Sequence, residues 1–141
     1  MQVGITRIDP SLPLPSYGSA GAAGFDLYCR LDIAIEPGAL ARLPTNVILA
    51  VPDGYFLMVA LRSGTPQRKG LLSPHGVGII DQDYRGPKDE VLVQVYNFGG
   101  ETVRIARGER SAQGMLTPVE RCEWEEGPAA ATSRGGFGST G

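Results

Sequence analysis

The sequence has few stretches in which a regular helix could form, because glycine and proline are spread along its whole length. Its 141 residues include 20 glycines and 11 prolines, and the longest stretch free of both is residues 25–36. Proline removes a backbone donor, and glycine costs a helix about 1 kcal/mol relative to alanine. This distribution excludes a protein built from helices of ordinary length and favours one domain of short β-strands.

Cysteine, net charge and long apolar runs are also scarce. The two cysteines, Cys29 and Cys122, form no disulfide framework and no metal-ligand spacing, so we expect two buried thiols in a reducing compartment. No apolar run reaches the ~18 residues of a membrane span, and the N-terminal residues lack a signal-peptide pattern. A net charge of −2 gives no electrostatic reason to bind nucleic acid or a membrane. We therefore expect a cytoplasmic protein that binds neither.

Several apolar segments have the patterns of short strands, either alternating or rich in β-branched and aromatic residues. They are residues 31–36, 47–51, 55–59, 91–96, 102–105 and 114–119. The turn residues 52–54 (Pro-Asp-Gly) predict a hairpin between the second and third segments. Thr65 as N-cap, Pro66 as first helical residue and Gly70 as stop predict one short helix. An all-β sandwich, jelly roll or small barrel over residues 1–122 is therefore expected.

The C-terminal residues 123–141 differ from the rest in composition. Acidic residues come first, then a glycine-, proline- and alanine-rich stretch, then serine, arginine and glycine. Such a segment has too little apolar surface to fold on itself. We expect an arm that is either disordered or docked onto another surface.

Five segments do not fit the strand pattern: residues 22–27, 62–64, 76–86, 108–113 and 133–141. In the first, Asp26 lies in an apolar run, where burial requires an ion pair or a cation. In the second, the Arg62 guanidinium, the Ser63 hydroxyl and the Gly64 backbone N–H could together bind a phosphate. Each segment also has a plainer explanation, such as a structural ion pair, a surface turn, a polar hairpin tip or a flexible tail.

The third and fourth segments contain groups suited to catalysis. The apolar residues before Asp81 could desolvate its carboxylate, which could then act as general base on a water molecule. Tyr84 could lie flat beneath a sugar ring. Gln113 enters an apolar strand, where its amide could hold a metal-bound water or a phosphate oxygen, unless backbone groups satisfy it.

In this order the five segments resemble the five motifs of the trimeric dUTPase family, over almost the whole chain from residue 22 to residue 141. The resemblance implies a β jelly roll, or distorted β-barrel, that assembles as a homotrimer with three active sites shared between chains. It implies hydrolysis of dUTP to dUMP and pyrophosphate with Mg²⁺. It also implies that the arm, residues 123–141, closes over the active site of a neighbouring subunit.

The resemblance assigns roles to individual residues. Asp81 corresponds to the carboxylate that activates the water attacking the α-phosphorus, and Tyr84 to the aromatic that packs on deoxyribose and excludes ribonucleotides. Asp26 and Gln113 correspond to groups that hold Mg²⁺ through water, and Gln113 also lies near the phosphates. Further substrate contacts are implied at the phosphates (Arg62, Ser63 and Gly64), around uracil (His75, Gly78, Ile79 and Ile80) and in the arm (Arg134, Phe137, Gly138, Ser139 and Thr140).

The sequence also departs from the family pattern. His75 stands where some members carry an asparagine, so its imidazole either contacts uracil or faces solvent. Residues 87–90 make the segment after Tyr84 longer than usual. Two other functions stay open: a nucleotide-binding regulator without turnover, and a relative of dCTP deaminase. The presence of Asp81, Asp26 and Gln113 favours a hydrolase.

Overall fold

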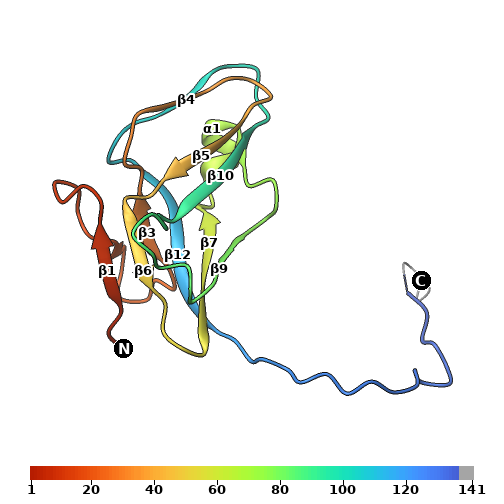
Figure 1. Cartoon of the computed structure of the whole chain (residues 1–141). Coiled ribbons are helices and arrows are strands. Elements are labelled where there is room, and N and C mark those ends of the chain that lie inside the picture. The colour runs from red at the N-terminus through yellow and green to blue at the C-terminus, as the bar shows by residue number, and fades with distance from the viewer. Residues whose placement is uncertain (137–141) are drawn as a thin grey trace.

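The computed structural model describes residues 1–136, and in this part of the chain almost all regular structure is β (Figure 1). The only helix of the described residues is α1 (Thr65–Lys69). The strands are β1 (Gly4–Arg7), β2 (Ser16–Tyr17), β3 (Phe25–Tyr28), β4 (Ile33–Ile35), β5 (Leu40–Pro44), β6 (Val47–Ala50), β7 (Tyr55–Leu61), β8 (Leu71–Leu72), β9 (Gly78–Ile80), β10 (Leu92–Asn97), β11 (Val103–Ile105) and β12 (Arg110–Pro118). The all-β prediction is confirmed.

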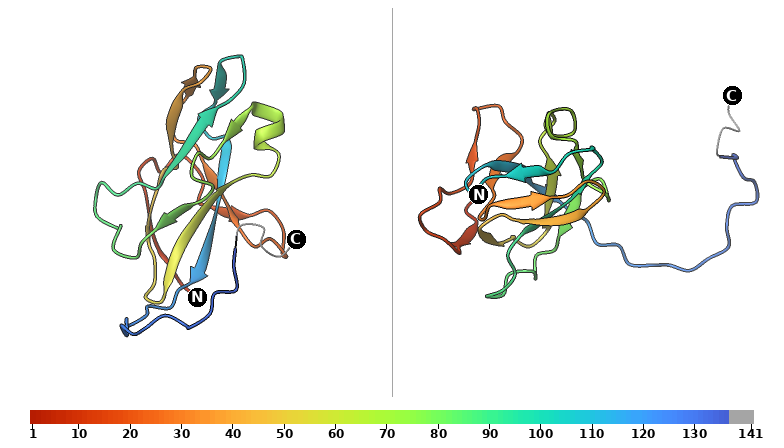
Figure 2. Two further views of the ribbon diagram at one scale, coloured as in Figure 1. Left: turned by 90° about the vertical axis from the view of Figure 1, so that its right-hand side faces the viewer. Right: turned by 90° about the horizontal axis from the view of Figure 1, so that it is seen from above.

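The strands form small antiparallel sheets that enclose one core (Figure 2). The largest sheet has the order β2-β3-β12-β7-β9, and the next has the order β5-β10-β8. The pairs β1-β6 and β11-β4 complete the jelly-roll-like body. Its core contains fully buried side chains from different sheets: Leu27 of β3, Ile35 of β4, Leu43 of β5, Leu57 of β7 and Val95 of β10.

The predicted hairpin around residues 52–54 is wrong. The turn exists, with the Tyr55 N–H donating to the Pro52 carbonyl at 3.2 Å, but β6 pairs with β1 and β7 lies between β12 and β9. β12 pairs with β7 along the whole length of β7, from Leu61 opposite Ala112 to Tyr55 opposite Pro118. The four-residue β6 offers fewer partners than the nine-residue β12, so the long-range pairing replaces the local one.

The short helix is present, but its first residues are assigned differently. Gly64 is the N-cap and there is no side-chain capping hydrogen bond, because Thr65 is itself the first helical residue; its N–H donates to the Arg62 carbonyl at 2.9 Å. Gly70 ends the helix at φ 64°, as its left-handed preference predicts. At five residues, α1 is far too short to cross a membrane, and no other helix occurs in residues 1–136.

The two cysteines lie in different environments. Cys29 is fully buried, and its burial raises the pKa of the thiol. Cys122 is exposed, so the expectation of two buried thiols is wrong for this residue. Cys122 follows β12, in a segment that no strand covers. Neither cysteine is in a disulfide, in agreement with the prediction.

After β12 the chain leaves the body of the protein (Figure 1). The Val119 N–H donates to the Gly54 carbonyl at 2.9 Å, and residues 119–136 are then exposed and form neither helix nor strand. The remaining predicted arm residues, Phe137, Gly138, Ser139 and Thr140, lie outside the described residues.

Gly114 of β12 lies against the Phe25 ring with no room for a side chain. A Cβ at this position would be 2.5 Å from Phe25 Cε2 and 3.1 Å from Leu57 Cδ1. We expect Gly114→Ala to lower the free energy of unfolding by about 1–3 kcal/mol, measured by urea denaturation, because the core must shift to admit the methyl group. Gly21→Ala is the matched control, since nothing lies within 4 Å of its Cβ position. Equal effects of the two substitutions would contradict this packing.

Candidate active site

A pocket of about 440 Å³ lies where β7 ends, α1 follows and β12 begins. Its lining contains four cationic side chains: Arg62, Arg68, Lys69 and Arg110. The predicted phosphate-binding residues Ser63, Gly64 and Gln113 line the same pocket. The chain has a net charge of −2, but four of its cationic side chains line this pocket. Such a local concentration of positive charge attracts a polyanion.

The turn after β7 gives the pocket its shape. The hydrogen bond from the Thr65 N–H to the Arg62 carbonyl folds Ser63 and Gly64 back over the strand end. A Cβ on Gly64 would lie only 3.2 Å from Arg68 Nε and 3.5 Å from Arg68 Cζ. Gly64 therefore lets the Arg68 guanidinium lie directly over the turn.

Asp26 is the buried acid next to this pocket. It lies on β3 opposite Gln113 of β12, and its side chain is 5% exposed. Arg62 Nε is 3.4 Å from Asp26 Oδ1, and Arg110 Nη1 is 3.3 Å from Asp26 Oδ2. One carboxylate thus faces two guanidinium groups, so the buried ion pair considered from the sequence is present.

The oxygen Asp26 Oδ1 keeps unused hydrogen-bonding capacity. Within residues 1–136 it is buried and has no hydrogen-bond partner, since Arg62 Nε approaches it only as an ionic contact. A buried acceptor without a partner costs free energy unless a water or ligand supplies a donor. Asp26 Oδ1 is therefore a position where a bound water could be held.

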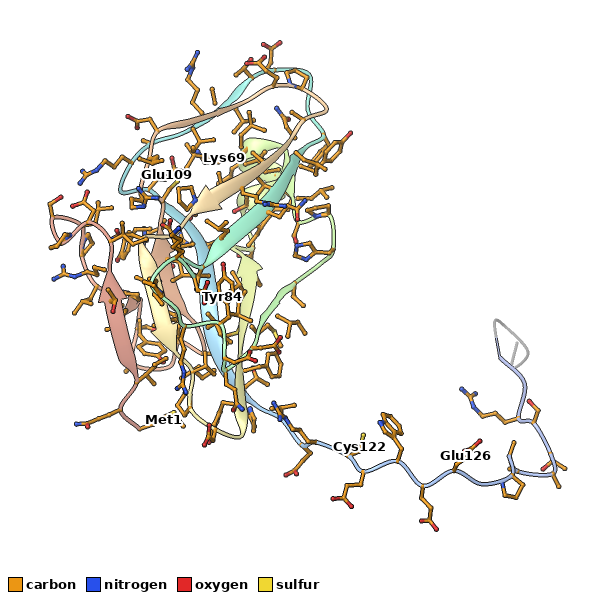
Figure 3. The ribbon with its side chains drawn as sticks, in the orientation of Figure 1. Met1, Lys69, Tyr84, Glu109, Cys122 and Glu126 are labelled. Carbon is orange, nitrogen blue, oxygen red and sulfur yellow. The ribbon has the colours of Figure 1, made fainter. Side chains whose placement is uncertain are left out.

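Lys69 and Glu109 form an ion pair at the rim of the pocket. Lys69 Nζ is 2.7 Å from Glu109 Oε1, and Figure 3 shows the two residues close together at one end of the molecule. Counting Asp26 and Glu109 against the four cations leaves the pocket positive. Arg68 forms no salt bridge with any residue of the described part.

Asp81 lies at the opposite end of β7 from this pocket. β9 pairs antiparallel with β7, with Gly78 opposite Val59 and Ile80 opposite Leu57. Asp81 therefore follows at the level of Phe56, six residues from Arg62, or about 20 Å at about 3.3 Å per residue. Within one chain, Asp81 does not meet the phosphate-binding residues.

The expected desolvation of Asp81 is not found in the single chain. Asp81 is exposed, and the preceding Ile79 is 60% exposed. A second pocket of about 370 Å³ lies beside them, lined also by Tyr55, Val119 and Arg121. The apolar residues before Asp81 are therefore exposed to solvent in the single chain. The carboxylate would be covered only if another chain or a ligand packed against this surface.

His75 faces solvent and stabilises the turn before β9. Its Nδ1 lies 2.7 Å from the Val77 carbonyl oxygen, and a carbonyl only accepts, so Nδ1 carries the proton and donates. The turn passes through Gly76 at φ 79°, a conformation that favours glycine. This agrees with the solvent-facing alternative and leaves Nε2 as a free acceptor.

Tyr84 and Arg134 are the remaining predicted residues within the described part. Tyr84 is 36% exposed, and its hydroxyl donates to the Glu90 carbonyl at 3.2 Å. Figure 3 shows Tyr84 well away from Lys69 and Glu109. Arg134 is exposed, in the C-terminal segment that forms neither helix nor strand.

Comparisons with known proteins agree with this arrangement. The model of the dUTPase family matches residues 11–141. This chain belongs to the dUTPase family. It is 47% identical to the deoxyuridine 5′-triphosphate nucleotidohydrolase of Anaplasma marginale over 135 residues, 92% of this chain and 90% of that protein. The crystal structure of dUTPase from Streptococcus mutans matches with a TM-score of 0.79 and 32% identity, covering 86% of this chain and 99% of that one.

A second solved structure supports the fold alone, because its identity to this chain is only 20%. It is a mutant dUTPase from phage phi11 of S. aureus, described with the coordination of a structural Mg(II) ion. It matches with a TM-score of 0.82 and covers 92% of this chain and 98% of that one.

Reasoning from the sequence missed part of the cationic pocket in this dUTPase-family chain. Arg68 and Lys69 were assigned only to a short helix, and Arg110 only to the segment before Gln113. The available signal was the closeness of these cations to the predicted site residues, since Arg68 and Lys69 come soon after Arg62 and Arg110 comes shortly before Gln113. The pairing of β12 with both β3 and β7 brings the two groups together, and the local pattern does not contain that pairing.

We expect the pocket to bind inorganic pyrophosphate, and Arg62→Met to weaken that binding at least tenfold. The reason is the loss of a charge-assisted hydrogen bond, typically about 1.5–3 kcal/mol. Isothermal titration calorimetry would measure the affinity. Arg42→Met removes an exposed arginine of β5 that does not line the pocket, and it should leave the affinity unchanged. Equal losses in both variants would show that only overall charge matters.

Proposed function

We propose that this protein is a dUTP diphosphatase that hydrolyses dUTP to dUMP and pyrophosphate. The observation that carries the proposal is the cationic pocket of Arg62, Ser63, Gly64 and Gln113 beside the buried Asp26, in a chain of the dUTPase family. The relative from Anaplasma marginale is named for this reaction, and the family match covers nearly the whole chain.

The active site is completed between chains of a homotrimer. The separation of Asp81 from Arg62 along β7 supports this. Within one chain the base and the phosphate site lie at opposite ends of the strand, so they can meet only if they come from different chains. The exposed Ile79 and the open pocket beside Asp81 provide surface for a neighbouring chain. In this assembly the C-terminal arm, residues 123–141, closes over the bound nucleotide of a neighbour with Arg134, Phe137, Gly138, Ser139 and Thr140. A cytoplasmic location stays a prediction from the sequence.

Asp81 acts as the general base. It accepts a proton from the water that attacks the α-phosphorus, and a neighbouring chain that covers it excludes bulk solvent from the reacting groups. Arg62, Ser63 and the Gly64 N–H bind the phosphates and stabilise the negative charge that develops on the leaving pyrophosphate. Gln113 donates from its amide to a phosphate oxygen.

The backbone of β9 recognises uracil. β9 is the edge strand of its sheet, so within residues 1–136 the N–H and C=O groups on its outer side have no strand partner. These groups can imitate the pairing edge of a base, and Gly78 allows close approach. Cytosine presents the opposite donor and acceptor pattern, so the same edge refuses it. Tyr84 packs against the deoxyribose.

Mg²⁺ fits this site through water rather than through direct protein ligands. Among residues 1–136 there is no group of three acidic, histidine or cysteine side chains that could enclose an ion. Mg²⁺ usually keeps several waters and binds nucleotide phosphates, and it then neutralises phosphate charge. Asp26 Oδ1, which is buried and lacks a donor, would hold a metal-bound water, and Gln113 opposite it would hold another. The structural Mg(II) ion of the phage phi11 dUTPase shows that a dUTPase can coordinate this metal.

Asp81→Asn should lower turnover of dUTP by about 10²–10⁴-fold, the usual contribution of a general base, while dUTP binding stays within a few-fold. A pyrophosphate-release assay measures turnover, and calorimetry with a non-cleavable dUTP analogue measures binding. Asp83→Asn in the same loop is the control and should retain activity. The assay is run in parallel with dUTP, dCTP, dTTP and UTP. A dUTP diphosphatase releases pyrophosphate from dUTP, a regulator without turnover releases none from any of them, and a relative of dCTP deaminase would act on dCTP instead.

Mixed trimers test whether the site is shared. Chains carrying Asp81→Asn or Arg62→Met should each have low activity alone, since the first lacks the base and the second binds the phosphates weakly. When they are unfolded and refolded together in equal amounts, about a quarter of the sites should combine a normal Asp81 from one chain with a normal Arg62 from another. Activity should therefore recover to about a quarter of the wild-type value. No recovery in a trimer of proven mixed composition would show that both residues act from the same chain.

A further inference from the structure

Glu90 is a buried acid at the end of the loop that carries Asp81 and Tyr84. It is 8% exposed, and both carboxylate oxygens are used. Arg30 Nε donates to Oε1 at 2.9 Å and Arg30 Nη2 donates to Oε2 at 2.8 Å. The backbone N–H of Asn46 also donates to Oε1, at 2.8 Å. This bidentate contact raises the pKa of the Arg30 guanidinium and is the strongest geometry an ion pair offers.

A second set of contacts fixes the backbone next to Glu90. The Val91 carbonyl accepts from the Thr45 N–H at 3.1 Å and from Thr45 Oγ1 at 2.7 Å, while the Val91 N–H donates to the Val47 carbonyl at 2.9 Å. Asn46 adopts φ 71°, which asparagine tolerates better than most residues, so that its N–H points at Glu90. The end of the loop is thereby joined to the buried turn between β5 and β6.

The rest of the loop, residues 81–89, has little other support. The Gly86 N–H donates to Asp89 Oδ2 at 2.6 Å, and a Cβ on Gly86 would come within 2.9 Å of that oxygen. These contacts lie inside the loop and do not attach it to the core. The Tyr84 hydroxyl does attach it, because it donates to the carbonyl of the anchored Glu90 at 3.2 Å.

We propose that Glu90, held by Arg30, is a positioning residue that fixes the Tyr84 ring and so sets the preference for deoxyribonucleotides over ribonucleotides. The inference rests on the proposed function, in which Tyr84 lies against the deoxyribose. A ring tethered at its hydroxyl cannot move aside for a 2′-hydroxyl. If the Tyr84 hydroxyl loses its hydrogen bond to Glu90, or if Glu90 is no longer held by Arg30, the ring can shift and admit a 2′-hydroxyl.

This role differs from a purely structural one in what it changes. A buried ion pair that only stabilised the fold would, when broken, lower thermal stability and affect all substrates alike. A positioning role changes the ratio of kcat/KM for dUTP to kcat/KM for UTP and leaves kcat for dUTP nearly constant. Glu90 is also the last residue of segment 87–90, which is predicted from the sequence to be longer than usual for the family.

The test uses Tyr84→Phe, which keeps the ring and removes the tether, and Glu90→Gln, which keeps the shape and removes the charge that binds Arg30. Each should reduce the dUTP/UTP preference about fivefold to tenfold, mainly through a lower KM for UTP, and Glu90→Gln should keep kcat for dUTP within about twofold. The double variant should lose little more than either single one, because both act through one hydrogen bond. Glu36→Gln, which affects only an exposed contact with Thr102, is the control.

Hydrogen exchange of residues 81–89 supplies a readout independent of activity. Glu90→Gln should speed exchange in this loop while the exchange of β7 and β12 stays as in the wild type. An unchanged loop, or an unchanged dUTP/UTP preference in Tyr84→Phe, would overturn the inference. If Glu90→Gln does not fold, the Tyr84→Phe preference alone decides. A wild-type protein that does not hydrolyse dUTP would instead refute the proposed function.

Discussion

The pairing of β7 with β12 is the constraint on which the rest of the structure depends. These strands form the centre of the largest sheet, and the register from Leu61 opposite Ala112 to Tyr55 opposite Pro118 allows no slip without exposing Leu57 and Val59. One end of β7 continues into Arg62 and the cationic pocket. At the other end, β9 carries Asp81. The length of a single strand therefore separates the cationic pocket from Asp81.

Electrostatics in the cationic pocket is a balance around one buried carboxylate. Arg62 and Arg110 would repel each other in the absence of Asp26, and Asp26 would be too costly to bury without them. The three groups satisfy one another only in part, since contacts of 3.3–3.4 Å are long for charge-assisted hydrogen bonds. The arrangement keeps both guanidinium groups near the pocket, and each retains N–H donors that are not used by Asp26. A weakly acidic protein can thus present a local cationic site.

The sequence predicted the architecture well where the signal is local. The glycine and proline distribution predicted a β protein, and Gly70 predicted the end of α1. The failures concern partners distant in sequence: residues 52–54 form a turn but not a hairpin, because β7 finds β12 some fifty residues later. Cys122 was expected inside and lies outside, because it follows β12 in a segment that forms neither helix nor strand.

The candidate site was also predicted where the signal is local and missed where the partners are distant in sequence. Local motifs identified Asp26, Arg62 and Gln113, which the sheet brings together. They could not indicate that Asp81 would lie elsewhere and exposed, because that depends on which end of β7 meets β9. Nor could they indicate Glu90, whose partners Arg30 and Asn46 lie 60 and 44 residues away along the chain.

The C-terminal segment begins beside Asp81, where the Val119 N–H is fixed to Gly54, and not beside the cationic pocket. From that root, residues 119–136 can span at most about 60 Å when fully extended, more than the width of a domain of this size. Reach therefore does not limit where the segment acts. What limits it is the entropy lost when a free tether becomes ordered, and this loss sets its effective concentration over any surface it covers. In the closure proposed above, shortening or stiffening this segment would change how often it closes without changing a contact of the closed state.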